Sequence, residues 1–111
     1  MDDEAITASG MIDPALLAAE LDTIEYQVVD AAGLDFDADI YATESQGRLR
    51  EMVDILNRAE PRFGSAVKAY SWYRSEPLPG FSGQSAMDLV RDGRAAEVLD
   101  YIRAVDAGLH N

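Results

Sequence analysis

Helix-stopping residues recur at short intervals along this chain, and their spacing limits what it can fold into. Glycine or proline stands at Gly33, Pro61, Gly64, Gly93 and Gly108. Between these stops the apolar residues recur at intervals of three and four, which is typical of the buried face of a helix. No segment shows the alternation of apolar and polar residues that would predict a strand. The sequence therefore predicts an all-α fold, a small bundle of short helices.

The first half reads as four helices with recognisable starts and stops. Asp13 at the N-cap and Pro14 at the first helical position are a clear helix start. Thr23 can cap the second helix, and Gly33 suits the left-handed position that ends it. A helix, a glycine turn and another helix at this spacing resemble a helix-turn-helix pair. The expected helices span residues 15–21, 23–32, 35–42 and 43–59, and Pro61 is expected to end the last.

The second half reads as three helices around a loop rich in proline and glycine. Ser65 opens the first of these helices, which is rich in aromatic residues. The loop, residues 75–84, cannot be helical because of its two prolines. Ser85 with Asp88 three residues later is the capping pattern that begins a short helix. The expected helices span residues 65–74, 85–93 and 94–107.

The negative charge of the chain is concentrated in its first half. The 111 residues carry a net charge of −12, and residues 1–47 contain twelve Asp or Glu but no Lys or Arg. Residues 61–111 balance six acids with six bases. An acidic half of this kind repels phosphate backbones, because non-specific DNA binding rests on Lys and Arg. We expect a disordered acidic lead-in at residues 1–10, a first helical region at 11–60 and a second at 61–111.

The side chains that catalysis or metal binding would need are missing from the sequence. The chain has no Cys and one His, so neither a disulfide framework nor a zinc site is expected. Ser85 and His110 are far apart and have no acid to orient them, so they do not predict a nucleophile–base pair. The acidic start is unlike a signal peptide, and no apolar run is long enough to cross a membrane. We therefore expect a cytoplasmic protein that is not an enzyme and needs no metal or cofactor.

Short motifs follow one another in a distinctive order through the second half. They are Phe63-Gly64, Trp72, Pro77, Phe81-Ser82-Gly83, Ser85, Asp88-Leu89-Val90, Gly93, Val98, Ile102 and Gly108. In this order and spacing they resemble the toxin-binding domain of the Xre/MbcA/ParS-type antitoxins, which partner RES-domain toxins. The resemblance covers residues 63–111 well and residues 10–62 loosely.

The resemblance implies a type II antitoxin in which a degenerate Xre-like helical region precedes the toxin-binding domain. Its partner would be a RES-domain toxin that consumes NAD, as an NAD-degrading enzyme or as an ADP-ribosyltransferase. The antitoxin would be a homodimer within the toxin–antitoxin complex, and its end, Gly108-Leu109-His110-Asn111, would plug the toxin's NAD pocket. The toxin-binding residues would come from the loop and the two helices after it: Phe81, Gly83, Ser85, Asp88, Leu89, Arg91 and Arg94.

The alternative function is an Xre-type DNA-binding transcriptional regulator that controls its own operon. Relatives often carry basic residues on the third helix, whereas residues 35–42 here carry three carboxylates and no base. The phosphate contacts would then fall to Arg48, Arg50 and Arg58 on the next helix, which argues against DNA binding through the acidic pair. A third idea is that the acidic half imitates nucleic acid on a basic protein surface. For Trp72 and Phe81 the sequence alone allows either a core or an interface position.

Overall fold

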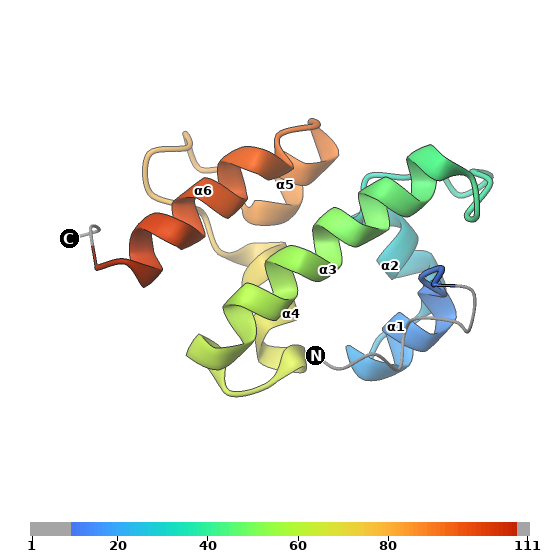
Figure 1. The fold of residues 1–111 in the computed structure, drawn as a ribbon, viewed down its shortest axis with the longest axis horizontal. Helices are drawn as coiled ribbons and strands as arrows, with labels where there is room; N and C mark the ends of the chain where they lie inside the picture. Colours follow the sequence, from blue (N-terminus) through green and yellow to red (C-terminus); the bar gives the residue numbers. More distant parts are fainter. Residues whose placement is uncertain (1–9, 109–111) are drawn as a thin grey trace.

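The chain is built around one long helix, α3, against which most of the other helices pack (Figure 1). A computed structural model describes residues 10–108, and within them the chain forms six helices and no strand. This confirms the all-α prediction. The helices are α1 (Pro14–Glu20), α2 (Glu25–Ala31), α3 (Thr43–Phe63), α4 (Ala66–Ser75), α5 (Ala86–Arg91) and α6 (Ala95–Asp106).

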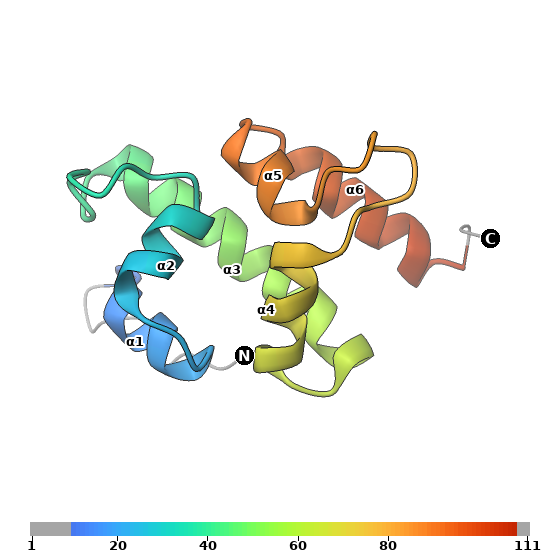
Figure 2. The same cartoon turned by 180° about the vertical axis from the view of Figure 1, so that it is seen from behind.

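A single hydrophobic core joins the two halves of the chain. α4, α5 and α6 contact α3, while α1 packs on α2 and α2 also reaches α5 (Figures 1 and 2). Leu49, Met52 and Leu56 are fully buried on α3, at the spacing that the sequence predicts for its apolar face. The same core extends from Ile12, before α1, to Ile102 on α6. Each side chain buried in this way stabilises the fold by about 1.5–3 kcal/mol.

A buried glutamine fastens two irregular segments to the start of α3. The Gln46 side-chain amide donates to the carbonyls of Ile12, over 3.0 Å, and Ile40, over 2.9 Å. Its oxygen accepts from the amide of Ile12 over 2.7 Å. A buried amide is stable in the core only when its donors and acceptor are paired, as they are here. The hydrogen bonds therefore hold the approach to α1 and the approach to α3 against the same helix.

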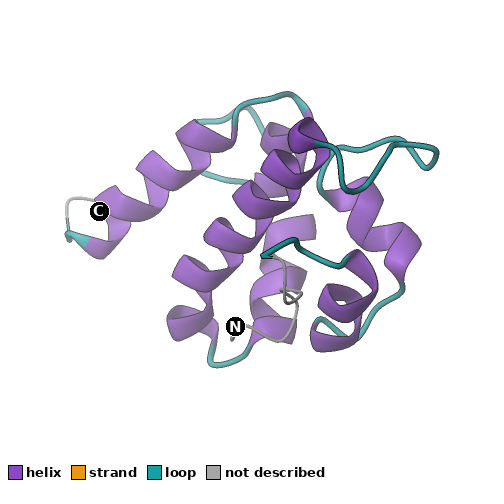
Figure 3. Cartoon of the chain, turned by 45° about the vertical axis from the view of Figure 1, so that its right-hand side comes forward, coloured by secondary structure: helices purple, strands orange, loops and turns teal. Residues whose placement is uncertain are grey.

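Three of the N-terminal caps that the sequence predicts are present. The Asp13 carboxylate accepts from the amide of Ala15, and the Ser65 hydroxyl accepts from the amide of Lys68. Ser85 and the residue three positions later form a reciprocal capping box at the start of α5. Each cap pairs a backbone donor that the first turn of a helix leaves open. The helices consequently begin close to their predicted positions. Figure 3 shows how loops and turns connect these helices in the described part of the chain.

The glycine stops after α2 and α5 have the same geometry. Gly33 and Gly93 lie in the left-handed region, with φ of +82° and +80°. At each, the amides of the glycine and of the following residue donate to carbonyls of the last helical turn. Those distances are 2.9 and 3.1 Å after α2, and 3.0 and 2.7 Å after α5. This pairing satisfies carbonyls that the helix end would leave open, and it confirms both predicted stops.

The helix predicted at residues 35–42 is wrong, because this segment forms successive turns. The amide of Ala38 donates to the carbonyl of Asp35 over 3.0 Å, and Ala42 donates to Asp39 over 3.1 Å. The Asp39 carboxylate also accepts from the amide of Tyr41. Short carboxylate side chains compete with the helix for backbone amides in this way. The expected pairing of residues 23–32 with a helix at 35–42 therefore does not form, and residues 32–42 connect α2 to α3 irregularly.

Two helix boundaries also differ from the prediction. Ile24, rather than Thr23, is the N-cap of α2. The Thr23 hydroxyl instead donates to the side-chain oxygen of Gln27 over 2.8 Å and does not cap the helix. α3 continues through Pro61 and ends at Phe63. Proline lacks an amide hydrogen, but this one is exposed in the last turn, where water can hydrate the unpaired carbonyl. Proline therefore did not stop the helix where the sequence suggested.

Candidate functional site

The loop at residues 76–84 connects α4 to α5 and is held at both ends. Pro77 and Ser85 meet in an isolated antiparallel bridge. The amide of Leu78 donates to the carbonyl of Gln84 over 2.9 Å. Leu78 is only 3% exposed, so one residue of the loop belongs to the core. A loop pinned in this way presents its remaining side chains from a fixed backbone.

The far end of the loop rests on α6. The ring of Phe81 meets Tyr101 edge-on, with 6.3 Å between the ring centroids and 88° between their planes. Phe81 is partly buried at the rim of the core, so it is intermediate between the core and interface positions that the sequence allowed. Gly83, also predicted to bind toxin, is exposed with a φ of +84°. Phe81 therefore lies where the loop contacts α6, and Gly83 lies on the exposed part of the same loop.

Three of the predicted toxin-binding residues are structural members of α5. The Ser85 hydroxyl accepts from the amide of Asp88 over 3.2 Å, and the Asp88 carboxylate accepts from the amide of Ser85 over 3.0 Å. Leu89 is fully buried in the core. Ser85 is buried and Asp88 half-buried, so these side chains fix the helix that carries the nearby surface.

The two predicted toxin-binding arginines, Arg91 at the end of α5 and Arg94 at the N-cap of α6, already have partners within the chain. Arg91 approaches Asp30 on α2 at 3.7 Å. Arg94 donates to Glu97 twice, over 2.6 and 2.9 Å, and to Gln84 of the loop over 3.3 Å. The hydrogen bonds from Arg94 lower the pKa of the Glu97 carboxyl. Arg94 therefore links the loop to the start of α6 while its remaining surface faces solvent.

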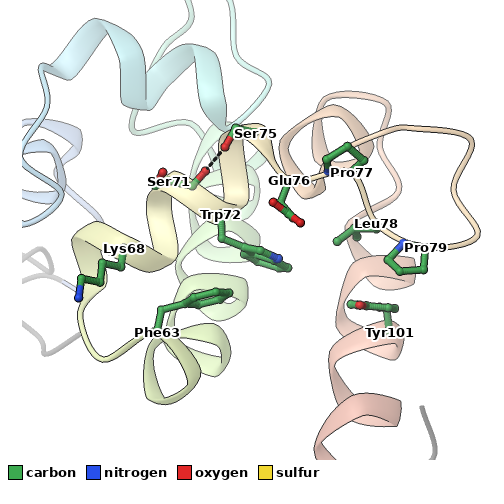
Figure 4. A pocket seen from close by; sticks show the side chains of 10 residues that line it. All are labelled: Phe63, Lys68, Ser71, Trp72, Ser75, Glu76, Pro77, Leu78, Pro79 and Tyr101. Atoms are coloured by element: carbon green, nitrogen blue, oxygen red, sulfur yellow. Dashed lines mark hydrogen bonds between the residues drawn. The ribbon is translucent and has the colours of Figure 1, made fainter. Parts of the chain in front are cut away.

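A groove of about 630 Å³ separates α4 from α6 next to the loop (Figure 4). Phe63 at the end of α3 and Trp72 on α4 form one wall, with 5.7 Å between their ring centroids. Tyr101 on α6 forms the opposite wall with Pro77 and Pro79 of the loop. Trp72 is partly buried and faces this groove, so it too is intermediate between core and interface.

The sequence did not lead us to predict Tyr101 as part of a binding surface. The residue follows Val98 by three positions and precedes Ile102, so it lies at the edge of the apolar stripe of α6. An aromatic side chain at the edge of such a stripe was the available signal. What could not be read from the sequence is that α6 brings this ring opposite Trp72.

The chain leaves α6 at Gly108, which has a φ of +74° and donates its amide to the carbonyl of Val105 over 3.0 Å. The predicted helix stop at this glycine is confirmed. The other residues of the predicted plug, Leu109, His110 and Asn111, lie outside the described residues. Their role stays a prediction.

The three arginines considered for DNA binding lie in different surroundings on α3. Arg48 donates to the carbonyl of Val90 at the end of α5 over 2.7 Å, so it ties two helices together. Arg50 donates to the carbonyl of Gly10 over 3.3 Å, and Arg58 is exposed. A guanidinium that bonds to its own backbone is a weaker clamp for phosphate. The prediction that DNA binding is doubtful is consistent with these contacts.

A second exposed apolar surface lies in the acidic half. We call it the Tyr26–Phe36 face; Tyr26, Val29, Phe36 and Ile40 line it together with Glu25. Phe36 is 83% exposed and Tyr26 64% exposed. Phe36 and Ile40 lie four residues apart, a helical spacing, but the turns at residues 35–42 do not form a helix. Of the large apolar side chains exposed within residues 10–108, all but Val67 precede α3.

The described residues give no sign of a metal centre or of a membrane span. Within residues 10–108, no three His, Cys, Asp or Glu side chains lie close enough to hold a metal ion. No helix in this part of the chain is both long and apolar enough to cross a bilayer.

Comparison with known families identifies the part of the chain that contains the loop, the groove, α5 and α6. Residues 58–108 match the family model of the antitoxin Xre/MbcA/ParS C-terminal toxin-binding domain. Neither a curated protein nor a solved structure matches the chain. The match begins near the end of α3 and ends where α6 closes, so it leaves the acidic first half outside. Residues 58–108 are therefore an Xre/MbcA/ParS-type antitoxin toxin-binding domain, and the partner of such a domain is a toxin.

Proposed function

We propose that this protein is the antitoxin of a type II toxin–antitoxin system and that it neutralises a RES-domain, NAD-consuming toxin. The observation that carries the proposal is the match of residues 58–108 to a toxin-binding domain. The surface of that region supports a protein partner, because its charges balance and aromatic side chains are half-exposed on it. Its resemblance to antitoxins that partner RES-domain toxins supplies the class of toxin.

We further propose that inhibition is steric. The pinned loop and α6 supply the contact area, and Phe81, Gly83, Arg91 and Arg94 face the toxin from its surface. Leu89, Ser85 and Asp88 contribute by fixing α5, since they are buried or engaged in its cap. α6 ends at one extremity of the molecule (Figure 1). Residues 108–111 would then enter the toxin's NAD pocket, where an apolar side chain, an imidazole and a carboxamide suit a nucleotide site.

The experiment is to co-purify the chain with the protein encoded beside its gene, which the proposal expects to be a RES-domain toxin, and to measure NAD consumption. Deleting residues 108–111 should leave the complex intact and restore the toxin's activity. A control replaces the same four residues with glycine and serine, which keeps the length but removes the side chains. If the shortened chain still inhibits fully, the plug is wrong. If no complex forms with the whole chain, the antitoxin proposal itself is wrong.

We also propose that two copies associate through the Tyr26–Phe36 face. An exposed apolar face of this kind marks an interaction surface more often than it occurs by chance on a monomer. Its position outside residues 58–108 leaves the toxin-binding domain of each copy available. Because Glu25 and neighbouring carboxylates would approach each other across the dimer, the association should be weak at low salt.

A further inference from the structure

The groove between α4 and α6 is apolar and nearly neutral, which narrows what it can bind. Its walls are three aromatic rings, two prolines and Leu78, as Figure 4 shows. Lys68 and Glu76 are the charged residues that line it, one of each sign. A nucleic acid or a strongly basic peptide would find no matching charge here. An apolar side chain would bury its surface against aromatic rings on both sides, which is the usual anchor of a protein interface.

The walls of the groove are fixed before anything binds. Trp72 is held by its contact with Phe63, and Tyr101 by its edge-on contact with Phe81. The ion pair between Arg62 and Asp106, 3.3 Å long, ties the end of α3 to the end of α6. A preformed site costs little ordering on binding, so more of the contact energy appears as affinity.

The loop wall has few free hydrogen-bond donors, and its acceptors are the carbonyls of Pro77 and Pro79, because the Leu78 carbonyl already accepts from the amide of Phe81 over 3.2 Å. Pro77 and Pro79 have no amide hydrogen, and the amide of Leu78 is already paired with Gln84. On the α4 side, the Ser75 hydroxyl donates to the carbonyl of Ser71 over 2.6 Å. A bound chain must therefore supply amide or side-chain donors along the loop. An extended backbone with free amides meets this need, whereas a helix pairs most of its amides internally.

We propose that this groove seats an extended segment of the partner toxin that presents an apolar or aromatic side chain between Trp72 and Tyr101. The occupant follows from position, since every residue that lines the groove lies within the toxin-binding domain at residues 58–108. The inference rests on the proposed function and adds to it the point of anchorage. The groove holds the toxin in place, and the residues after α6 block its active site.

Trp72 makes the proposed binding site (the seat of the toxin segment) directly testable, because it is the only tryptophan in the chain. The chain is produced with fluorotryptophan, so it gives one fluorine NMR resonance, and unlabelled RES-domain toxin from the adjacent gene is added. Ser71→Arg places a long charged side chain in the groove from an exposed position on α4. Ala19→Arg is the matched control, with the same change of charge at an exposed position of α1, outside the toxin-binding domain. Thermal unfolding confirms that both variants are folded.

The expected result has two parts. The resonance of Trp72 moves when the toxin binds, and Ser71→Arg weakens the complex at least about tenfold while Ala19→Arg binds like the wild type. If the complex forms and the resonance stays in place, the groove is not the seat, although the antitoxin function stands. The groove is likewise excluded as the seat if the resonance moves but Ser71→Arg binds normally. If no complex forms, the seat and the antitoxin function both fail.

Discussion

Replacing Gly33 by alanine should destabilise the protein more than the same change at Gly93. Both glycines end a helix in the left-handed region with the same pair of backbone hydrogen bonds. An alanine at Gly93 would place its Cβ in open space, with no atom within 4 Å. At Gly33 the Cβ would lie 3.1 Å from the Cα of Arg91 and 3.4 Å from Nη1 of Arg48. Both variants would therefore have the same backbone strain, but only Gly33→Ala would also have a close contact with a neighbouring helix.

The expected loss in the free energy of unfolding combines the cost of the backbone strain with the cost of the close contact. The left-handed conformation costs an alanine about 1–2 kcal/mol, which is the whole expected loss for Gly93→Ala. At Gly33 the neighbouring atom belongs to the backbone, so α5 must move by a few tenths of an ångström or the close contact must persist. Crowding of this kind typically adds about 1–3 kcal/mol. We expect Gly33→Ala to lose about 2–5 kcal/mol, against a typical stability of about 5–15 kcal/mol.

The assay is urea unfolding of the two variants and the wild type, with the free energy of unfolding extrapolated to water. The slope of each transition should stay the same, because neither substitution changes the surface exposed on unfolding. Equal losses at the two glycines would refute the close approach of α2 to α5 at this point. A larger loss at Gly93 would refute the shared geometry of the two helix stops.

Three further predictions concern single side chains. Tyr73 is buried and donates to the carbonyl of Ala31 over 2.7 Å, and burial raises its pKa. Its contribution to stability is therefore complete well below about pH 10, the ordinary tyrosine pKa, and is lost as pH rises through it. Tyr73→Phe should reduce the alkaline loss of stability by about 1.4 kcal/mol in total between about pH 9 and 11, measured by denaturation. Phe36→Ser should convert the proposed dimer to monomer in analytical ultracentrifugation, and the proposed wild-type association should strengthen with added salt; a dimer unaffected by the substitution would place the interface elsewhere. Arg48→Ala should lower the free energy of unfolding by about 1.5 kcal/mol or more and Arg58→Ala by less than about 0.5 kcal/mol, because only the first removes a charged hydrogen bond between helices.

Local chemistry made the helix ends predictable from the sequence. A cap needs an acceptor such as Asp13 or Ser85 beside the first turn, and a left-handed stop needs a residue such as Gly33. These requirements are met within a few residues of chain, so they can be read before the fold is known. Residues 35–42 failed for the same local reason, since three Asp residues favour turns over the helix that Phe36 and Ile40 suggested.

The surface of the candidate site depended on packing between distant segments, and the sequence could not supply it. Leu89 was expected on the toxin-binding surface, yet α5 is short and turns this side chain into the core. Arg48 was considered for DNA, yet the end of α5 lies within reach of its guanidinium. The groove needs Phe63, Trp72 and Tyr101 from three helices, and its existence depends on how those helices cross. Motif order identified the domain, whereas side-chain placement decided which of its residues are exposed.

The toxin-binding domain should not fold when it is separated from the acidic half. Its helices α4, α5 and α6 pack against α3, and Leu49, Met52 and Leu56 lie on the part of α3 that precedes residue 58. A fragment of residues 58–111 would expose the core surface that these side chains cover. We expect it to show little helical circular dichroism and no cooperative melting, whereas the whole chain should show a strong helical signal and melt cooperatively. A fragment that melts cooperatively would mean that the domain is autonomous and that the shared core contributes little to it. In that case the only role left for the acidic half would be in the proposed dimer. The core that runs from Ile12 to Ile102 argues instead that the acidic half also holds the toxin-binding surface in shape.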